Sequence, residues 1–314
     1  MVRDTGYIKM KYKIYIPSRG RYDRLLTGDY FMENGMDFSL VVEKNEGDLY
    51  REKYPNNVIE LPGSNYGGVY FARNFIKRLS TNAGEKRHWQ VDDDIKKLIY
   101  IKDGKPADIS PNKILENMEN FCDKFKNIGI ASPYDTMWVK YGKKPFETNK
   151  LAHACSLISN DLDIWWSREV MGDIDYNIQV LENGWCTLRF YIFSFITSPR
   201  TSQKGGFTDI YLNKNRINMV KATQKKWGLG KISEKTVSGN TVYVVEYTKK
   251  FREYNQKLIA DFNGMYLKKA REITQEYIKA YGGNWAYIDI LDKMIAKAIE
   301  DEVNDWINEL YIQQ

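Results

Sequence analysis

The chain has 314 residues, a formal net charge of +6 and 43% hydrophobic residues. This length suggests one large domain or two modest ones, and no apolar stretch is long enough for a membrane span or a secretion signal. The cysteines Cys122, Cys155 and Cys186 stand far apart among apolar neighbours. Their placement predicts buried free thiols in a reducing cytoplasm rather than a disulfide or metal framework.

Strand-like and helix-like segments alternate through the first part of the chain. This alternation predicts an α/β fold with a mostly parallel, right-handed sheet. Apolar spacing and turn residues predict these elements in chain order: a strand at 13–16, a helix at 22–34 that ends at Gly35, a strand at 38–42, a helix at 47–53, a strand at 58–61, a helix at 69–79 and a strand at 88–91.

The second part of the chain is predicted to be more antiparallel. From about Val244 the apolar positions have helical spacing, so we expect a helical C-terminal region that Gly282 and Gly283 divide in two. Before it, the pattern predicts a helix at 111–126, strands at 128–132, 154–159 and 188–196, and a helix that begins near Asp173 and ends at Gly184.

Three consecutive carboxylates, Asp92, Asp93 and Asp94, follow the predicted strand at 88–91. Like charges this close repel, so a protein keeps them mainly where a cation neutralises them or where they cap a helix. Asp92 and Asp94 form an Asp-x-Asp pair, and a hard divalent ion that carries nucleotide phosphates needs only a few such protein ligands. A surface turn or a helix cap is the open alternative.

Other charged residues also fall just after predicted strand ends. Arg19 and Arg21 flank Gly20 in a turn, and Glu43 follows the strand at 38–42. In open α/β sheets ligands bind beyond the carboxyl ends of the strands, so these residues and the acidic triplet should converge on one crevice. Guanidinium groups suit phosphate there, although two arginines in a turn are also ordinary surface residues.

Three further groups are candidate site residues. Arg73 follows the glycine-rich loop at 63–68, and its position also fits an exposed helix residue. Asp173 and Asp175 lie at a helix start, where a carboxylate can act as a general base or simply cap the helix. The aromatic residues Trp138, Trp165 and Trp166 are expected near the acceptor side, where they could stack on a base or sugar.

A basic stretch runs from Arg200 to Lys231 and contains a single acidic residue, Asp209. Phosphate backbones favour such stretches through counterion release, and a solvated lysine face is the alternative. The candidate nucleic-acid contacts are Arg200, Lys204, Lys214 and Arg216.

Taken together, four segments make the chain resemble a GT-A glycosyltransferase, and more narrowly the TET/JBP-associated glycosyltransferases, many of them phage-encoded. The segments are 14–21 (IYIPSRGR), 72–74 (ARN), 91–94 (VDDD) and 172–175 (GDID). The resemblance covers about residues 12–230. It implies a Rossmann-type mixed sheet with helices on both faces: 1–110 as the nucleotide-sugar-binding half, 111–240 as the acceptor half and 241–314 as a helical extension.

The resemblance also implies residue roles. Pro17, Arg19, Arg21 and Arg73 would contact the nucleotide diphosphate, Asp92 would face the ribose and Asp94 would hold Mn²⁺ or Mg²⁺. Asp173 would address the acceptor hydroxyl, with Asp175 behind it. Two departures stand out: Gly172 occupies a position where many GT-A enzymes have glutamate, and no histidine follows His153 to complete a metal site.

The implied activity is a hexosyl- or pentosyltransferase that moves a sugar from a nucleotide sugar, such as a UDP-sugar, to a hydroxymethylated pyrimidine in DNA. 5-Hydroxymethylcytosine and 5-hydroxymethyluracil are both candidates, and a bacteriophage enzyme would work in the host cytoplasm. The alternatives are a GT-A transferase for protein or glycan acceptors, a nucleotidyltransferase, and a non-catalytic nucleic-acid-binding module.

Overall fold

The computed structural model describes residues 7–63, 69–102, 105–107, 109–135, 144–198, 205, 215–237, 240–259 and 261. The chain divides into two compact units, the first formed by Met1–Glu119 and Asn127–Lys257 and the second by Asn120–Lys126 and Leu258–Gln314. In the second unit the rings of Phe121 and Phe125 are 5.1 Å apart, and Lys126 N–H donates to the Ile259 carbonyl. All described candidate site residues belong to the first unit.

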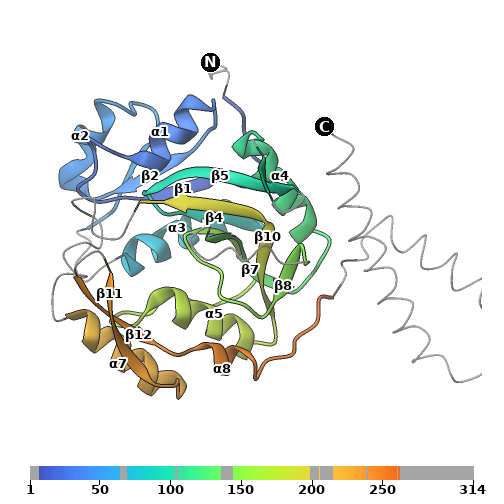
Figure 1. Cartoon of the computed structure of the whole chain (residues 1–314). Helices are drawn as coiled ribbons and strands as arrows, with labels where there is room; N and C mark the ends of the chain where they lie inside the picture. The colour runs from blue at the N-terminus through green and yellow to red at the C-terminus, as the bar shows by residue number, and fades with distance from the viewer. Residues whose placement is uncertain are drawn as a thin grey trace, which may run out of the picture. The chain divides into compact units, whose positions relative to one another are not determined.

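The first unit is built on a ten-stranded mixed sheet, shown in Figure 1. Four parallel strands form one side: β3 (Val58–Glu60), β2 (Ser39–Val42), β1 (Ile14–Pro17) and β4 (Arg87–Val91). The sheet continues through the antiparallel β9 (Cys155–Ser159) to β7 (Ile128–Asp135), the long β10 (Cys186–Thr197), β5 (Ile95–Lys102) and β6 (Lys105–Ala107), with β8 (Phe146–Thr148) paired to β10. The predicted α/β class with a mixed sheet is confirmed.

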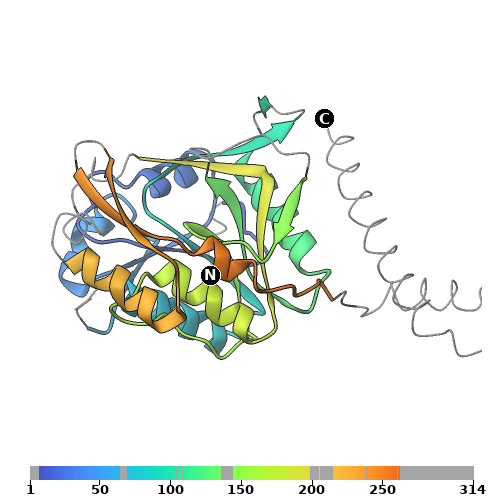
Figure 2. The ribbon, with the colours of Figure 1, turned by 60° about the horizontal axis from the view of Figure 1, so that its bottom comes forward.

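Helices cover both faces of this sheet. Figures 1 and 2 show α1 on one face and α3 and α5 on the other, with α7 beside α5. This arrangement places the start of α5 near α3, on the side of the sheet where the candidate residues lie. The helices are α1 (Leu26–Glu33), α2 (Gly47–Arg51), α3 (Tyr70–Asn82), α4 (Pro111–Cys122), α5 (Gly172–Glu182), α7 (Asn215–Trp227) and the short α8 (Thr248–Phe251).

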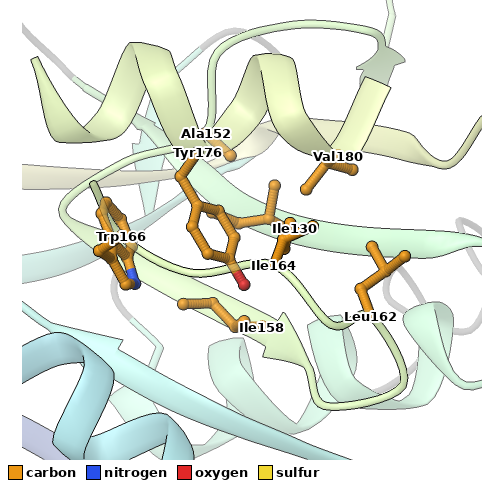
Figure 3. Close-up of a cluster of buried hydrophobic side chains, with 8 residues drawn as sticks. All are labelled: Ile130, Ala152, Ile158, Leu162, Ile164, Trp166, Tyr176 and Val180. Carbon is orange, nitrogen blue, oxygen red and sulfur yellow. The ribbon is translucent and has the colours of Figure 1, made fainter. Parts of the chain in front are cut away.

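A buried apolar cluster joins α5 to the sheet, as Figure 3 shows. Ile130 of β7 and Ile158 of β9 pack against Tyr176 and Val180 of α5. The approach is close, because a Cβ on Gly129 would lie 2.6 Å from a Val180 methyl carbon. Side chains at this density hold α5 against the sheet.

The predicted helix ends at glycine are confirmed. Gly35 and Gly184 have φ of 64° and 77°, a conformation that favours glycine at a helix C-terminus. All three cysteines are buried and free, as predicted. Across the described part of the chain, no helix combines the length and apolarity that a membrane span needs.

The helical prediction from Val244 is wrong for the described residues between Arg252 and Ile259, which are not helical. Before them, β12 (Asn240–Val245) pairs with β11 (Ile232–Val237) in a hairpin, so Val244 itself lies in a strand, and α8 is short. Beyond α8, asparagine side chains take the place of helical backbone amides as donors to the backbone carbonyls. Asn149 donates to the Gln256 carbonyl and Asn127 to the Lys257 carbonyl. The rest of the predicted helical tail lies outside the described residues.

Replacing Ile158 by alanine tests this core. Ile158 is fully buried in β9, so Ile158→Ala should lower the free energy of unfolding by about 2–5 kcal/mol through lost burial and a cavity. Thermal and urea unfolding would measure the change. Leu49→Ala is the control, because Leu49 is 40% exposed and should cost far less; equal losses would contradict this assignment of the core.

Candidate active site

The ends of the parallel strands β1, β2 and β4 meet, as the sequence predicts. Arg21, after β1, forms an ion pair with Asp93, after β4. Arg19 Nε lies 3.8 Å from a carboxylate oxygen of Glu43, which follows β2. These contacts bring the arginine turn, the acidic triplet and Glu43 to one edge of the sheet, where open α/β folds bind their ligands.

Asp93, the middle residue of the triplet, ties this edge together. Its carboxylate accepts a 2.7 Å hydrogen bond from Ser18 Oγ and pairs with Arg21. Tyr50 completes the cluster, 2.8 Å from Ser18 Oγ and accepting from the Arg21 amide at 3.1 Å. Burial raises the pKa of Asp93 to about 6, with Arg21 acting in the opposite direction. The carboxylate therefore stays ionised at neutral pH.

This pairing changes the interpretation of the arginine turn. The Arg21 side chain is only 10% exposed and is held by Asp93, so it does not fit the expected contact with a diphosphate. Arg19 is 47% exposed and is the accessible guanidinium of the turn. Pro17 ends β1 opposite Val41 and contributes the rigid start of the turn.

Two glycines hold the backbone of this turn. Gly20 has φ of 64°, and its amide donates to Glu46 at 2.8 Å. Gly205 lies directly on the turn, since a Cβ there would be 2.5 Å from the Arg19 carbonyl oxygen and 2.6 Å from that of Gly20. No larger residue fits at 205 without moving the turn.

The acidic triplet lies in the short connection between β4 and β5, which excludes the helix-cap alternative. Hydrogen bonds fix the backbone of its first residue, Asp92, through both the amide and the carbonyl. Asp92 N–H donates to the Ala154 carbonyl at 2.6 Å, and Thr27 Oγ1 donates to the Asp92 carbonyl at 2.5 Å. Ala154 accepts this bond with φ of 62°, a conformation that non-glycine residues adopt rarely.

The carboxylates of the triplet fit a hard divalent cation. Asp94 has no side-chain hydrogen bond or ion pair with another described residue, and burial together with Asp93 raises its pKa to about 6. Within the described ranges no group of three His, Cys, Asp or Glu side chains could hold a metal alone. Mg²⁺ and similar ions are commonly held by one or two carboxylates plus substrate phosphates, so Asp94 and its neighbour Asp92 are a suitable donor set.

Arg73 connects this triplet to the acceptor-side aspartate. From α3 its Nη2 donates to Asp92 at 2.8 Å and its Nη1 donates to Asp173 at 2.7 Å. The Arg73 side chain is 9% exposed, whereas Asp92 and Asp173 are 35% and 40% exposed. Burial opposes the charge on Arg73, but the two carboxylates outweigh it and raise its pKa above the usual range.

Trp166 lies under this guanidinium and is not available to a ligand. Its ring stacks on Tyr176 at 4.5 Å, and the Arg73 guanidinium carbon lies 4.2 Å from the ring centroid. Because Trp166 is only 5% exposed, it does not fit the expected stacking on a base or sugar. Trp165 lies beside Arg78 at 5.4 Å, and Trp138 is outside the described residues.

The two aspartates of the 172–175 segment differ in environment. The N-cap of α5 is Met171, with no side-chain cap hydrogen bond, so capping does not explain Asp173. Asp175 is fully buried: Lys226 and the Trp227 indole contact its Oδ1 at 2.6 and 2.8 Å, and Gln179 donates to its Oδ2. A carboxylate enclosed in this way joins α5 to α7, and it does not fit the expected catalytic contact with substrate.

The predicted nucleic-acid residues are only partly described. Arg200, Lys204 and Lys214 lie outside the described residues, and Arg216 is buried at 7% exposure, so it does not fit an external phosphate contact. The same helix, α7, exposes Lys221, Lys225 and Lys226.

Sequence reasoning missed several residues that shape the site. Ser18 and Asp93 lie inside the 14–21 and 91–94 segments, but nothing in the sequence showed that Asp93 would be buried against Ser18 and Arg21. Nothing in the sequence pointed to Tyr50, because its hydroxyl contacts the amide of Arg21, which is 29 residues away in the chain.

The fold and site together define an α/β protein with carboxylates and an exposed arginine at the carboxyl ends of its parallel strands. Residues 12–206, more than half of the chain, match the TET-Associated Glycosyltransferase family, and the chain belongs to this family. It is therefore a glycosyltransferase. No curated protein matches the chain.

Replacing Asp93 by asparagine tests the cluster at the strand ends. Asp93→Asn removes one charge of a buried pair and leaves Arg21 unneutralised, so the free energy of unfolding should fall by about 3–5 kcal/mol. Chemical unfolding would measure it. Asp48→Asn is the control: Asp48 pairs with Arg51 on the surface and is fully exposed, so no measurable loss is expected there. A stable Asp93→Asn protein would contradict the structural role of this pair.

Proposed function

We propose that the protein transfers a sugar from a nucleotide sugar, such as a UDP-sugar, to a hydroxymethylated pyrimidine in DNA, and that the reaction depends on Mn²⁺ or Mg²⁺. The observation that carries the proposal is the pairing of one donor-side and one acceptor-side carboxylate, Asp92 and Asp173, on the same guanidinium. The family supports the sugar transfer, and the acceptor and the metal are the proposed parts.

On the donor side, the accessible groups are Arg19, Asp92 and Asp94. Asp94, with Asp92 beside it, would hold the divalent ion, which supplies positive charge to the departing diphosphate. Arg19 is exposed and can reach phosphate oxygens, whereas Arg21 stabilises the turn through Asp93. Asp92 keeps one oxygen on Arg73 and offers the other to the ribose or the ion.

On the acceptor side, Asp173 is the part-exposed carboxylate. Asp173 would orient the hydroxymethyl oxygen and accept its proton. In the same step this oxygen would bond to the anomeric carbon of the sugar, and the bond from that carbon to the diphosphate would break. A base inside a duplex must leave the stack to reach such a site, so mismatched or single-stranded substrates should be preferred.

The central test is a transfer assay on modified DNA. The full-length protein is incubated with nucleotide sugars, Mn²⁺ and DNA containing 5-hydroxymethylcytosine or 5-hydroxymethyluracil, and the digested nucleosides are weighed. Gain of a hexose or pentose mass is expected, with release of a nucleoside diphosphate. Asp94→Asn should abolish transfer and donor hydrolysis, and Asp173→Asn should slow transfer about 100-fold or more while it spares donor hydrolysis.

Three outcomes would overturn the proposal. Release of pyrophosphate would indicate nucleotidyl transfer. Sugar added to protein or glycan but not to DNA would indicate another acceptor. Full activity after removal of divalent ions by a chelator would exclude the metal-dependent step. Asp48→Asn, at the exposed surface of α2, is the matched control and should keep wild-type rates.

We expect the exposed lysines of α7 to bind DNA phosphates. Lys221 and Lys225 are four residues apart and so share one side of the helix. Lys221→Ala with Lys225→Ala should weaken binding to single-stranded DNA and reduce the slope of log affinity against log salt by about 1.4, at about 0.7 per contact. Fluorescence anisotropy at several salt concentrations measures this slope, and Lys113→Ala on α4 is the control. An unchanged slope would remove α7 from the proposed DNA surface.

A further inference from the structure

Arg73 holds two carboxylates at once, and this contact determines what the residue can do. We infer that Arg73 is a positioning residue that fixes Asp173 relative to Asp92, and so sets the acceptor hydroxyl against the donor, rather than a ligand of the donor diphosphate. This inference rests on the proposed function, because it assigns Asp92 to the donor and Asp173 to the acceptor.

The exposure of the three side chains gives the first argument. Asp92 and Asp173 are each more than one-third exposed, while the Arg73 side chain between them is 9% exposed. The guanidinium therefore lies behind the two carboxylates as seen from solvent. Its two terminal nitrogens already donate to them at 2.8 and 2.7 Å, so a diphosphate that took the place of either carboxylate would have to break an ion pair.

The surroundings of Arg73 give the second argument, because they restrict its movement. Its guanidinium lies on the Trp166 ring, and this buried ring also stacks on Tyr176. Its carbonyl accepts a hydrogen bond from Gln90 Nε2 at 3.0 Å. The next residue, Asn74, is bonded to the Trp166 backbone in both directions, at 3.0 and 2.9 Å.

Gly172 makes this arrangement compatible with the start of α5. A Cβ at Gly172 would lie 3.3 Å from the Trp166 ring, which is buried in contact with Arg73 and Tyr176 and cannot shift freely. The absence of a side chain lets the first turn of α5 approach Trp166, and this approach brings Asp173 within reach of Arg73. Gly172 is therefore consistent with the close approach that the Arg73–Asp173 contact needs.

The chemistry of the guanidinium suits this task. Its planar fork points two N–H groups in fixed directions, so it can set the separation of two carboxylates, whereas the ammonium of lysine is a point charge. A displacement of about 1 Å at a reacting group can cost about 100-fold in rate. The positive charge of Arg73 also reduces the repulsion between Asp92 and Asp173. Arg19 and the proposed ion at Asp94 remain available to the donor.

The test compares Arg73→Lys and Arg73→Met with the control Arg78→Met, which lies on the exposed side of the same helix. Calorimetry measures the binding of Mn²⁺ alone and of UDP with Mn²⁺, and separate assays follow donor hydrolysis and sugar transfer. We expect transfer to fall about 100-fold in both Arg73 variants, while the affinity for UDP with Mn²⁺ changes less than threefold. Mn²⁺ alone should bind more tightly to Arg73→Met, because a positive charge beside Asp92 is lost.

A diphosphate ligand would give the opposite pattern. If Arg73 binds the donor, Arg73→Met should weaken UDP binding at least tenfold and reduce hydrolysis and transfer together, and that result would overturn the inference. Unchanged transfer in Arg73→Lys would overturn it as well. Thermal unfolding identifies any variant that does not fold, and Arg73→Lys keeps the charge, so it carries the test if Arg73→Met unfolds.

A double-mutant comparison separates positioning from general damage. Because Arg73 is inferred to act through Asp173, adding Arg73→Lys to Asp173→Asn should lower transfer less than threefold further. Independent losses that multiply would overturn the inference. If the wild-type protein transfers no sugar to DNA, the proposed function fails, but the titrations with Mn²⁺ and UDP still decide whether Arg73 binds the donor.

Discussion

The rest of the site depends on Arg73, which forms ion pairs with both Asp92 and Asp173. Three part-exposed or partly buried carboxylates, Asp92, Asp94 and Asp173, would otherwise repel one another in one small region. Arg73 neutralises part of this charge from behind, and Trp166 gives its guanidinium a fixed surface. The carboxylates can then face solvent in defined positions, as the proposed binding of a cation and a charged donor requires.

The three arginines of the candidate site thus have two kinds of environment. Arg21 is buried and pairs with Asp93. Arg73 is buried and pairs with Asp92 and Asp173. Both stabilise the framework of the site. Arg19 is exposed and is left for the ligand. Buried ion pairs of this kind are costly to break, because the remaining charge has no partner, and so they give a rigid site rather than a large gain in stability.

The sequence predicted the α/β fold well, because strand and helix signals alternated clearly and glycine marked helix ends at Gly35 and Gly184. It also predicted that the strand-end residues converge. It could not predict the partners: Asp93 and Arg21 were separated by 72 residues, and nothing in their types showed that they would pair in the interior. Local spacing likewise suggested helix after α8, where asparagine side chains bind the backbone instead.

The most direct measurement is a crystal structure of the protein with Mn²⁺ and a nucleoside diphosphate. Our account predicts that the Arg73 guanidinium stays within hydrogen-bond distance of both Asp92 and Asp173, while the diphosphate contacts the metal at Asp94 and the side chain of Arg19. A structure in which Arg73 leaves either carboxylate to bind the diphosphate would contradict it.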